Sequence, residues 1–537
     1  MLFRSLGPGA GLTGVTIFGG TTTNRYLLET TGSGVALIDY DADGRLDLFL
    51  VNGTTLEGFP KGQEPRPHLY RNRGNGAFQD VTAAAGLRNQ WGWGQGACVG
   101  DYDNDGHDDL FVTYYGQNRL FHNTGRGTFV EATSASGLTS ARQRWGTGCA
   151  FLDIDRDGRL DLFVANYIDL DLATAPTPDS GLCRYKGVPV ACGPPGLTGG
   201  KNLLYWNRGD GTFVDVSESS GITKANGSYG LGVSTLDFDN DGWTDIYVAN
   251  DSNPSALYRN RHDGTFQDIG VLAGCAYSQD GKPQAGMGVG IGDFDRNGWL
   301  DIVKTNFAGD TSSLYANTGQ GRCEDRTFDA GLGLNTRWLG WGAGFADFDN
   351  DGWLDIFQTN GHVYPEVRQI RTEAGYEQRK VVYRNVGGRF DDVTARLGAP
   401  ATTPKAGRGT AFGDLDDNGT VDVVVNNIHD APDVFLTTAP ADRHWLLLRL
   451  VGTRSNRSAI GARVRVTTGQ VTQIREVQGG GSYLSQNDLR VHVGLGAASV
   501  VDRLEVRWPN GLEEAWTAVA ADRLLTLREG EGKALSQ

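Results

Sequence analysis

One nine-residue acidic pattern recurs seven times along this chain of 537 residues. It reads Asp-x-Asp-x-Asp/Asn-Gly-x-x-Asp, and its copies open at Asp39, Asp101, Asp153, Asp237, Asp293, Asp347 and Asp414. Carboxylates at positions one, three, five and nine, with a backbone carbonyl at position seven, offer a ring of hard oxygen ligands that suits Ca²⁺. Carboxylates crowded in this way repel one another unless a cation lies among them. The pattern therefore predicts a calcium-binding loop in each copy.

The expected ligands follow directly from these positions. The side-chain ligands are Asp39, Asp41, Asp43 and Asp47; Asp101, Asp103, Asp105 and Asp109; Asp153, Asp155, Asp157 and Asp161; Asp237, Asp239, Asp241 and Asp245; Asp293, Asp295, Asn297 and Asp301; Asp347, Asp349, Asp351 and Asp355; and Asp414, Asp416, Asn418 and Asp422. The residues that supply the backbone carbonyl are Arg45, His107, Arg159, Trp243, Trp299, Trp353 and Thr420. Position twelve is never Glu, which excludes an EF-hand.

The net charge of the chain is consistent with metal binding by these loops. They hold 26 of the 64 acidic residues, and seven bound Ca²⁺ would change the formal charge of the chain from −15 to −1. We interpret the acidity as up to seven structural calcium sites rather than as a surface for basic partners. Ions that tie the ends of hairpins would supply stability that short strands lack. The alternative is a set of solvated acidic turns, and the two loops with Asn could be weak or empty.

The elements that must carry the loops repeat with them. Glycines lie five and seven residues before every opening Asp, which places them on one face of a short strand where backbones crowd together. A run rich in β-branched and aromatic residues follows each loop, and two further strand-like segments complete a unit of four strands. Seven such units predict an all-β fold, a seven-bladed β-propeller over residues 1–438 with the glycine strands lining its axis.

The ends of this region suggest how the ring closes. The seventh unit lacks its fourth strand, and residues 3–6 resemble the missing segment, so we expect the N-terminal strand to complete it. The acidic loops stop near residue 438. The alternating apolar runs of residues 439–537 predict a second domain, a small antiparallel β-sandwich.

Composition excludes several classes of protein. There is no run of eighteen apolar residues, which excludes a membrane-spanning helix, and an isoelectric point near 5.0 argues against a nucleic-acid partner. The first residues have no long apolar core and do not resemble a signal peptide, so an export segment was either trimmed or never existed.

In its acidic loops and the strands around them, the chain resembles the FG-GAP/VCBS calcium-loop repeats of integrin-α-like propellers. It resembles more closely the cartilage acidic protein family with its C-terminal ASPIC/UnbV domain. The distinctive stretches are residues 32–36, 183–194 and 359–365 in the first region and 455–463, 478–486, 494–496 and 508–511 in the second. The resemblance covers almost the whole chain. It implies secretion, calcium binding and a role in a matrix or at a surface, although this copy lacks an export signal.

The face opposite the acidic loops is where we expect a ligand. Three long insertions, residues 52–67, 167–201 and 362–380, fall on that face and could wall a pocket over the axis. Beside the paired glycines, at the expected mouth of the ring, lie Trp93, Trp145, Tyr229, Met287, Trp341 and Arg408. An aromatic mouth with one arginine suits a planar, sugar-like or anionic ligand. The alternative is that these side chains only fill the gaps beside neighbouring glycines.

Two readings of the function remain open. The first is a secreted or periplasmic, calcium-stabilised binding or adhesion module for a glycan, matrix or protein partner. The second is an enzyme with a pocket over the axis that uses His362, Arg408 and Trp341. No Ser-His-Asp order, phosphate loop or His-rich metal motif occurs, so we favour binding over catalysis and assign no catalytic residue.

The six cysteines bear on the compartment. Cys183 and Cys192, nine residues apart in an insertion rich in Pro and Gly, are predicted to form a disulfide, which favours an oxidising environment. Cys98 and Cys149 fall on inner strands of adjacent units and are expected to be small buried hydrophobes. The pairing of Cys275 and Cys323 is left undecided.

Overall fold

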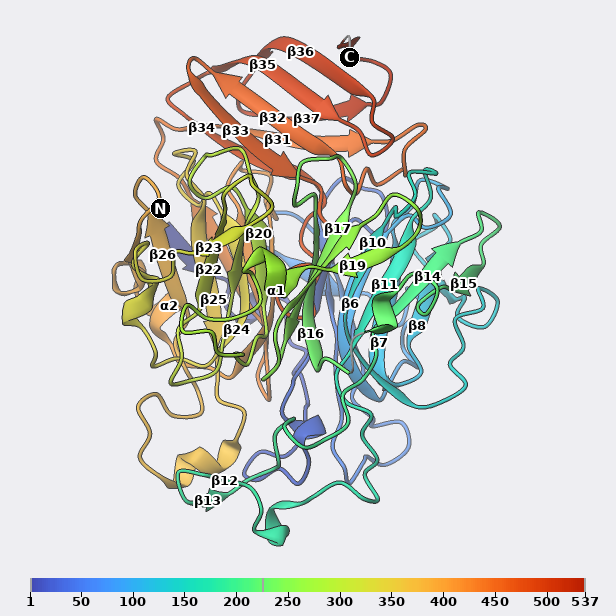
Figure 1. Cartoon of the computed structure of the whole chain (residues 1–537), viewed down its shortest axis with the longest axis vertical. Coiled ribbons are helices and arrows are strands. Elements are labelled where there is room, and N and C mark those ends of the chain that lie inside the picture. The colour runs from blue at the N-terminus through green and yellow to red at the C-terminus, as the bar shows by residue number, and fades with distance from the viewer. Residues whose placement is uncertain (1, 225–226, 536–537) are drawn as a thin grey trace.

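Short β-strands make up most of the regular structure. The computed structural model describes residues 2–224 and 227–535, and its two α-helices, α1 (Gly270–Ala273) and α2 (Ala399–Thr402), have four residues each. Figure 1 shows the strands of the first region below and a separate group of strands above them. The predicted all-β class is confirmed. No helix among the described residues is long and apolar enough to cross a bilayer.

Strand pairing divides the first region into groups of four antiparallel strands. In chain order these are β2 (Val35–Ile38), β3 (Asp47–Leu50), β4 (His68–Asn72) and β5 (Phe78–Asp80); β6 (Trp93–Gly100), β7 (Asp109–Gly116), β8 (Arg119–Asn123) and β9 (Phe129–Glu131); β10 (Arg144–Leu152), β11 (Asp161–Asn166), β14 (Leu203–Asn207) and β15 (Phe213–Asp215); β16 (Gly230–Leu236), β17 (Asp245–Asn250), β18 (Ala256–Asn260) and β19 (Phe266–Asp268); β20 (Val289–Gly292), β21 (Asp301–Lys304), β22 (Ser313–Asn317) and β23 (Cys323–Asp325); β24 (Gly340–Ala346), β25 (Asp355–Asn360), β26 (Val381–Asn385) and β27 (Phe390–Asp392); and β28 (Gly407–Gly413), β29 (Asp422–Asn427), β30 (Asp433–Thr438) and β1 (Leu2–Ser5). A short β7–β10 pairing joins the second and third groups.

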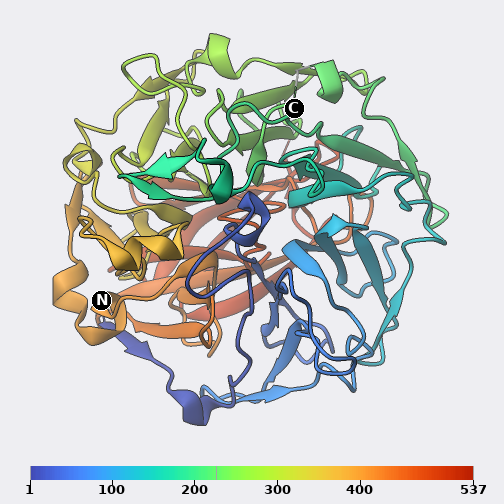
Figure 2. The same cartoon turned by 90° about the horizontal axis from the view of Figure 1, so that it is seen from below.

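These sheets surround a central axis, as the view from below shows (Figure 2). The first strand of each sheet lies innermost, and successive inner strands contact one another around the ring, with β28 contacting β2. The N-terminal strand β1 pairs with β30, so that Leu2 lies opposite Thr438 and Ser5 opposite Phe435. The first and last segments of this region therefore share one sheet.

The paired glycines lie where inner strands approach most closely. A Cβ atom added at Gly232 would lie 2.2 Å from the carbonyl oxygen of Met287 on the next sheet, and one at Gly288 would lie 2.1 Å from that of Trp341. Any side chain at these positions would push neighbouring sheets apart. This close approach explains why glycine recurs at the same offset before each acidic loop.

A second group of strands lies over the acidic-loop end of the ring (Figure 1). One sheet has the order β34 (Val491–Gly496), β31 (His444–Val451), β37 (Arg523–Arg528), and the other the order β33 (Val471–Glu476), β32 (Arg463–Thr468), β35 (Val500–Arg507), β36 (Glu513–Ala520), β38 (Lys533–Ala534). The expectation of a purely antiparallel sandwich needs one correction, because β31 and β37 pair in parallel. The chain crosses through the second sheet between these strands and can therefore return in the same direction.

A loop of this second group fills the axis of the ring. Residues 479–488 run between the inner strands: the carbonyl oxygen of Leu484 accepts a hydrogen bond from the backbone N–H of Ala97, and that of Ser482 accepts one from Val289. Tyr483 at its tip is completely buried. A Cβ at Gly34 would lie only 1.6 Å from the carbonyl oxygen of Leu484, so glycine there makes room for this loop. We call residues 479–488 the axial loop.

Candidate functional site

The acidic loops share one hydrogen-bonding scheme. In the third sheet the backbone N–H of Gly158 donates to Oδ2 of Asp153 (3.0 Å), which fixes the turn at position six. Asp161, at position nine, begins β11 and accepts backbone N–H bonds from Ile154 (2.9 Å) and from Asn207 at the end of β14 (2.8 Å). The scheme aims the remaining carboxylate oxygens into the centre of the loop.

The donors from the third strand were not recognised as part of the loops in the sequence. They are Asn72, Asn123, Asn207, Asn260, Asn317, Asn385 and Thr437. In six of the seven sheets this donor is an Asn that closes the third strand, and this recurrence is the signal that could have identified it. The donor fixes the orientation of the position-nine carboxylate.

The loop carboxylates fit a cation. Ligand oxygens of Asp39, Asp41 and Asp43 lie within 4.8 Å of one another, as do those of Asp153, Asp155 and Asp161 and those of Asp237, Asp239 and Asp245. Several of these oxygens are buried without a hydrogen-bond partner among the described residues: Oδ1 of Asp39, Asp41, Asp237, Asp239, Asp349 and Asp416. Buried acceptors without donors are costly unless a cation satisfies them. The loops therefore contain acidic groups that could hold a metal ion.

The electrostatics of the protein alone agree with this assignment. Burial, together with the charge of neighbouring loop carboxylates, raises the pKa of Asp47 and of Asp101 to about 8. Desolvation and like charges both disfavour the ionised form, whereas a nearby cation favours it. A divalent ion would relieve both costs.

In five of the seven loops a side chain from the third strand reaches a loop carboxylate. Arg71 pairs with Asp41 (2.7 Å) and Asp43, and Arg384 pairs with Asp349 and Asp351. The equivalent residues of the other four-carboxylate loops are His122, Trp206 and Arg259, each of which also reaches a loop carboxylate. In the two loops with Asn at position five the equivalent residues are Ala316 and Leu436. A donor therefore accompanies the fourth carboxylate and is missing where that carboxylate is missing.

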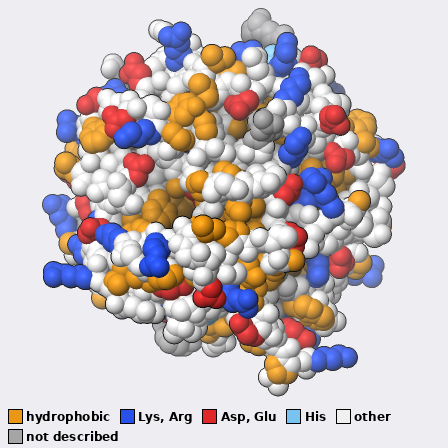
Figure 3. Space-filling view, turned by 60° about the horizontal axis from the view of Figure 1, so that its bottom comes forward, with side chains coloured by type: hydrophobic (Ala, Val, Ile, Leu, Met, Phe, Trp, Pro, Cys, Tyr) orange, Lys and Arg blue, Asp and Glu red, His pale blue; other side chains and the backbone are white. Residues whose placement is uncertain are grey.

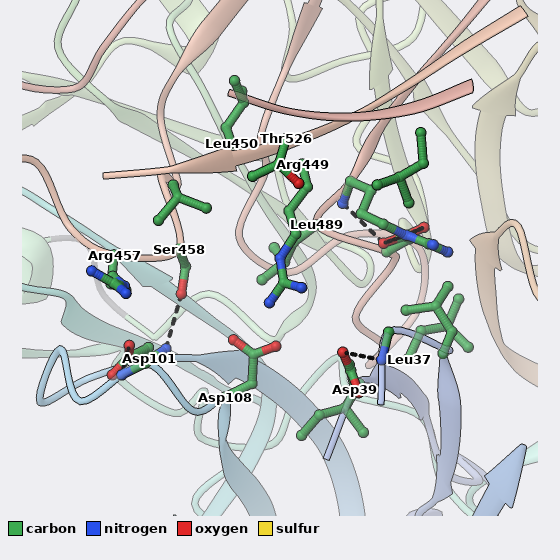
Figure 4. A pocket seen from close by; sticks show the side chains of 18 of the residues that line it. Leu37, Asp39, Asp101, Asp108, Arg449, Leu450, Arg457, Ser458, Leu489 and Thr526 are labelled. Carbon is green, nitrogen blue, oxygen red and sulfur yellow. Dashed lines mark hydrogen bonds and ion pairs between the residues drawn. The ribbon is translucent and has the colours of Figure 1, made fainter. Parts of the chain in front are cut away.

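The second group of strands covers the loop face. Arg463 donates to the carbonyl oxygen of Asp237 (2.9 Å), and Glu476 accepts the backbone N–H of Asp237 (3.1 Å). The hydroxyl of Ser458 accepts the backbone N–H of Asp101 (3.0 Å). Between the first two loops and β31 remains a pocket of about 310 Å³, in which Arg449 projects toward Asp39 and Asp108 (Figure 4). The loop face is therefore an internal interface of this chain over much of its area.

The opposite face carries a cavity of about 330 Å³ near the axis. Residues from two repeat positions line it. Leu231, Met287 and Trp341 stand between the paired glycines of successive sheets, and Tyr167, Asp251 and Phe307 stand fourteen residues after the opening Asp of successive loops. Tyr364 of the insertion 362–380, residues 193–195 of the insertion 167–201, and Leu27, Thr30 and Thr31 of the N-terminal segment also line it. Figure 3 shows the face that carries the insertions hollowed near its middle, with hydrophobic side chains around the hollow.

Of the residues expected at the mouth, Met287 and Trp341 line this cavity. Trp93, Trp145, Tyr229 and Arg408 do not, and neither does His362. Trp145 is fully buried and packs edge-on against Tyr115 and Tyr167. Sequence reasoning missed Tyr167 and Phe307, although both directly follow an Asn that recurs at one repeat position.

Arg408 acts as an internal tie rather than as an exposed anion receptor. It is 1% exposed, and its guanidinium donates to the carbonyl oxygens of Thr30, His362 and Gly407. The same group lies 4.1 Å from the ring centroid of Trp341. Burial lowers its pKa to about 10. Its hydrogen bonds join the N-terminal segment, the seventh sheet and the insertion 362–380.

Disulfides fasten two of the segments around the ring. The predicted Cys183–Cys192 bond is present, and it closes the loop that carries Tyr185 onto His362, with the two rings 4.8 Å apart. Cys275 and Cys323, which the sequence left undecided, form a second bond. Cys98 and Cys149 are free and buried, as expected.

Comparison with known proteins agrees with this organisation. The model of the FG-GAP-like repeat matches residues 39–112, 101–164, 190–248 and 237–304, and that of the ASPIC and UnbV domain matches residues 452–534. The chain carries FG-GAP-like repeats and an ASPIC and UnbV domain. The FG-GAP matches overlap at the acidic loops, and the ASPIC and UnbV match falls on the strands that cover them.

Relatives share both parts. Cartilage acidic protein 1 of Homo sapiens is 26% identical over an alignment of 506 residues, with 89% of this chain and 69% of that protein covered. Cartilage acidic protein 1 of Xenopus tropicalis is 26% identical over 505 residues, with 89% and 70% covered. Among solved structures, the BP39L lectin from Burkholderia pseudomallei gives a TM-score of 0.45 at 10% identity, with 76% of this chain and 97% of that chain covered. A lectin of Agrocybe aegerita that recognises terminal N-acetylglucosamine gives a TM-score of 0.38 at 17% sequence identity, with 70% of this chain and 84% of that chain covered.

Proposed function

We propose that this chain is a secreted or periplasmic, calcium-stabilised propeller that binds a glycan, matrix or protein partner through the face opposite its acidic loops. One observation carries the proposal: the ASPIC and UnbV strands cover the loop face, which leaves the opposite face, with its cavity and insertions, free for a partner. Two disulfides support an oxidising compartment. In this proposal the loops hold up to seven Ca²⁺ ions and serve the scaffold, and residues 1–438 and 439–537 form its two domains.

The enzyme alternative gains no support from the candidate residues. His362 is 2% exposed, and its Nδ1 accepts the backbone N–H of Tyr364. Burial lowers its pKa to about 3, so the imidazole is neutral at physiological pH. Nε2 of His362 is buried without a hydrogen-bond partner among the described residues, but a buried neutral histidine whose Nδ1 is already hydrogen-bonded fits a packing role.

The calcium part of the proposal is tested by thermal unfolding in calcium and in chelator. We expect calcium to raise the melting temperature of the whole chain, because it binds the folded loops and not the unfolded chain. Asp239→Asn should reduce this rise, because it removes a charge whose Oδ1 is buried without a partner. Asp442→Asn, an exposed change outside the loops, is the matched control. A melting temperature that is the same in calcium and in chelator would refute calcium stabilisation.

The binding part is tested with panels of immobilised glycans and matrix proteins in calcium buffer. Trp341→Ala should lower the affinity for the captured partner at least tenfold, because the substitution opens the wall of the cavity on the free face. Arg528→Ala, on the covered face, should leave capture unchanged. Equal loss in both variants would contradict the assignment of the binding face.

A further inference from the structure

The cavity on the free face contains one charged group. Of its lining side chains only Asp251 is ionisable to a charge at neutral pH, and the others are aliphatic, aromatic or hydroxyl-bearing. Its Oδ2 accepts a hydrogen bond from the hydroxyl of Tyr167 (2.5 Å), and its Oδ1 accepts one from the hydroxyl of Ser252 (2.9 Å). Among the described residues no lysine, arginine or histidine pairs with it. An unpaired carboxylate in apolar surroundings is costly, and a cation would remove that cost.

Four of the five hydroxyl groups of the cavity wall already donate to acceptors of the protein. Thr30 donates to the carbonyl oxygen of Leu27 (2.7 Å), and Thr31 donates to Oε1 of Gln95 (2.9 Å). The hydroxyls of Ser252 and Tyr167 are used by Asp251. The hydroxyl of Tyr364 is the one cavity hydroxyl with no hydrogen bond among the described residues, and the only charged group that remains is the acceptor Asp251. A ligand that supplies donors or positive charge therefore suits the cavity better than an anion does.

Aromatic side chains form much of the remaining wall. Tyr167, Phe307, Trp341 and Tyr364 come from three sheets and one insertion. The negative face of an aromatic ring attracts a cation within about 6 Å, and most strongly where water is excluded. The protein already shows this interaction at the same tryptophan, because the buried guanidinium of Arg408 lies over the ring of Trp341.

We infer that this cavity binds an organic cation, an ammonium group with apolar substituents, with Asp251 as counter-ion and the four aromatic side chains as walls. A volume of about 330 Å³ falls at the lower end of the range of small-molecule sites, about 300–1,000 Å³. The ammonium group is either a free small molecule or the end group of a larger one. The inference rests on the proposed function, because it names the ligand chemistry of the same free face.

Isothermal titration with choline and with its uncharged isostere 3,3-dimethylbutan-1-ol tests this inference on the full chain in calcium buffer. The two probes have the same shape and differ in the charge. We expect saturable choline binding at least tenfold tighter than that of the isostere. Equal affinities, or no choline binding, would overturn the inference.

Two variants assign the binding to this cavity. Asp251→Asn should weaken choline at least tenfold and leave the isostere unchanged, whereas Asp169→Asn, on the same face but outside the cavity wall, should change neither. Phe307→Leu keeps the lining apolar but removes an aromatic ring, and it should weaken choline more than the isostere. Choline binding that survives Asp251→Asn would overturn the inference.

Partner capture measured on the same preparations separates this inference from the proposed function. If Trp341→Ala abolishes capture of a glycan or protein while choline does not bind, the ammonium site is wrong and the binding face stands. If neither capture nor choline binding occurs, both fall.

Discussion

Lys304 is a buried cation in the wall of the fifth sheet. It ends β21, is completely buried, and its ammonium has no hydrogen-bond partner among the described residues. Its nearest compensation is the ring of Tyr315, whose centroid is 5.6 Å away. Burial lowers its pKa from the ordinary 10.5 to about 8, although Asp310 and Asp325 oppose the shift. The folded chain therefore disfavours the charged form that the unfolded chain prefers.

Lys304→Met should stabilise the protein at pH 7, by on the order of 3 kcal/mol, because it removes this buried charge. The unfolded wild type binds the lysine proton more tightly than the folded state between pH 8 and 10.5, so wild-type stability rises with pH across that window. The advantage of the variant should shrink there. Urea unfolding of both proteins at pH 7 and pH 10 measures the difference, and a pH-independent difference would contradict the assignment.

At the scale of elements, the inner strands are defined by close approach. The second glycine of a pair faces the next inner strand at Gly148, Gly232 and Gly288, among others, whereas Gly34 faces the axial loop. The register of each inner strand against its second strand is irregular just after the first glycine in several sheets, including β16 between Gly230 and Val233. Such bulges turn the strand where the cavity begins.

Gly288→Ala should lower the free energy of unfolding by at least about 2 kcal/mol, because the new methyl would lie 2.1 Å from the carbonyl oxygen of Trp341. Gly7→Ala is the matched control, since nothing lies within 4 Å of a Cβ there. Denaturant unfolding of both variants in calcium measures the effect. Equal, small effects would show that the inner strands can move apart at little cost.

At the scale of the whole molecule, the two parts of the chain share a core. The axial loop lies inside the ring, and Arg463, Glu476 and Asp237 form a buried network between β32, β33 and the fourth acidic loop. Arg463 lies 3.1 Å from Glu476, whose side chain is 1% exposed. Asp237 is therefore both a loop residue that could hold a cation and a docking contact of the ASPIC and UnbV strands.

Arg463→Met should destabilise the chain by roughly 3 kcal/mol, because it leaves the Glu476 carboxylate buried without its cation. It should also reduce the calcium-dependent rise in melting temperature, since Asp237 in the fourth loop loses a contact. Arg465→Met, two residues away on β32 and exposed, controls for the loss of charge. A variant that is destabilised but keeps the full calcium response would show that docking and metal binding are independent.

The repeating features of this protein could be predicted from its amino-acid sequence. The acidic loops, the paired glycines and the β-rich segments between them depend on residues close together in the chain, and their recurrence made them readable. The Cys183–Cys192 bond was also predictable, because nine residues of one insertion separate its partners. The spacing of nearby residues is sufficient to predict a feature when the interactions that produce it lie within one short segment.

The residues that fill the axis of the ring could not be predicted from the sequence, and the tertiary structure was needed to identify them. The axial loop contacts inner strands as distant in the chain as β2, where the backbone N–H of Leu37 donates to the carbonyl oxygen of Gln486, and no periodicity of the sequence predicts that it fills the ring. Arg408 was expected at an open mouth and is instead enclosed by three segments distant in sequence. The cavity gathers Tyr167, Asp251 and Phe307 because ring closure brings equivalent positions of successive sheets together. Contacts across the ring depend on closure, which no single repeat encodes.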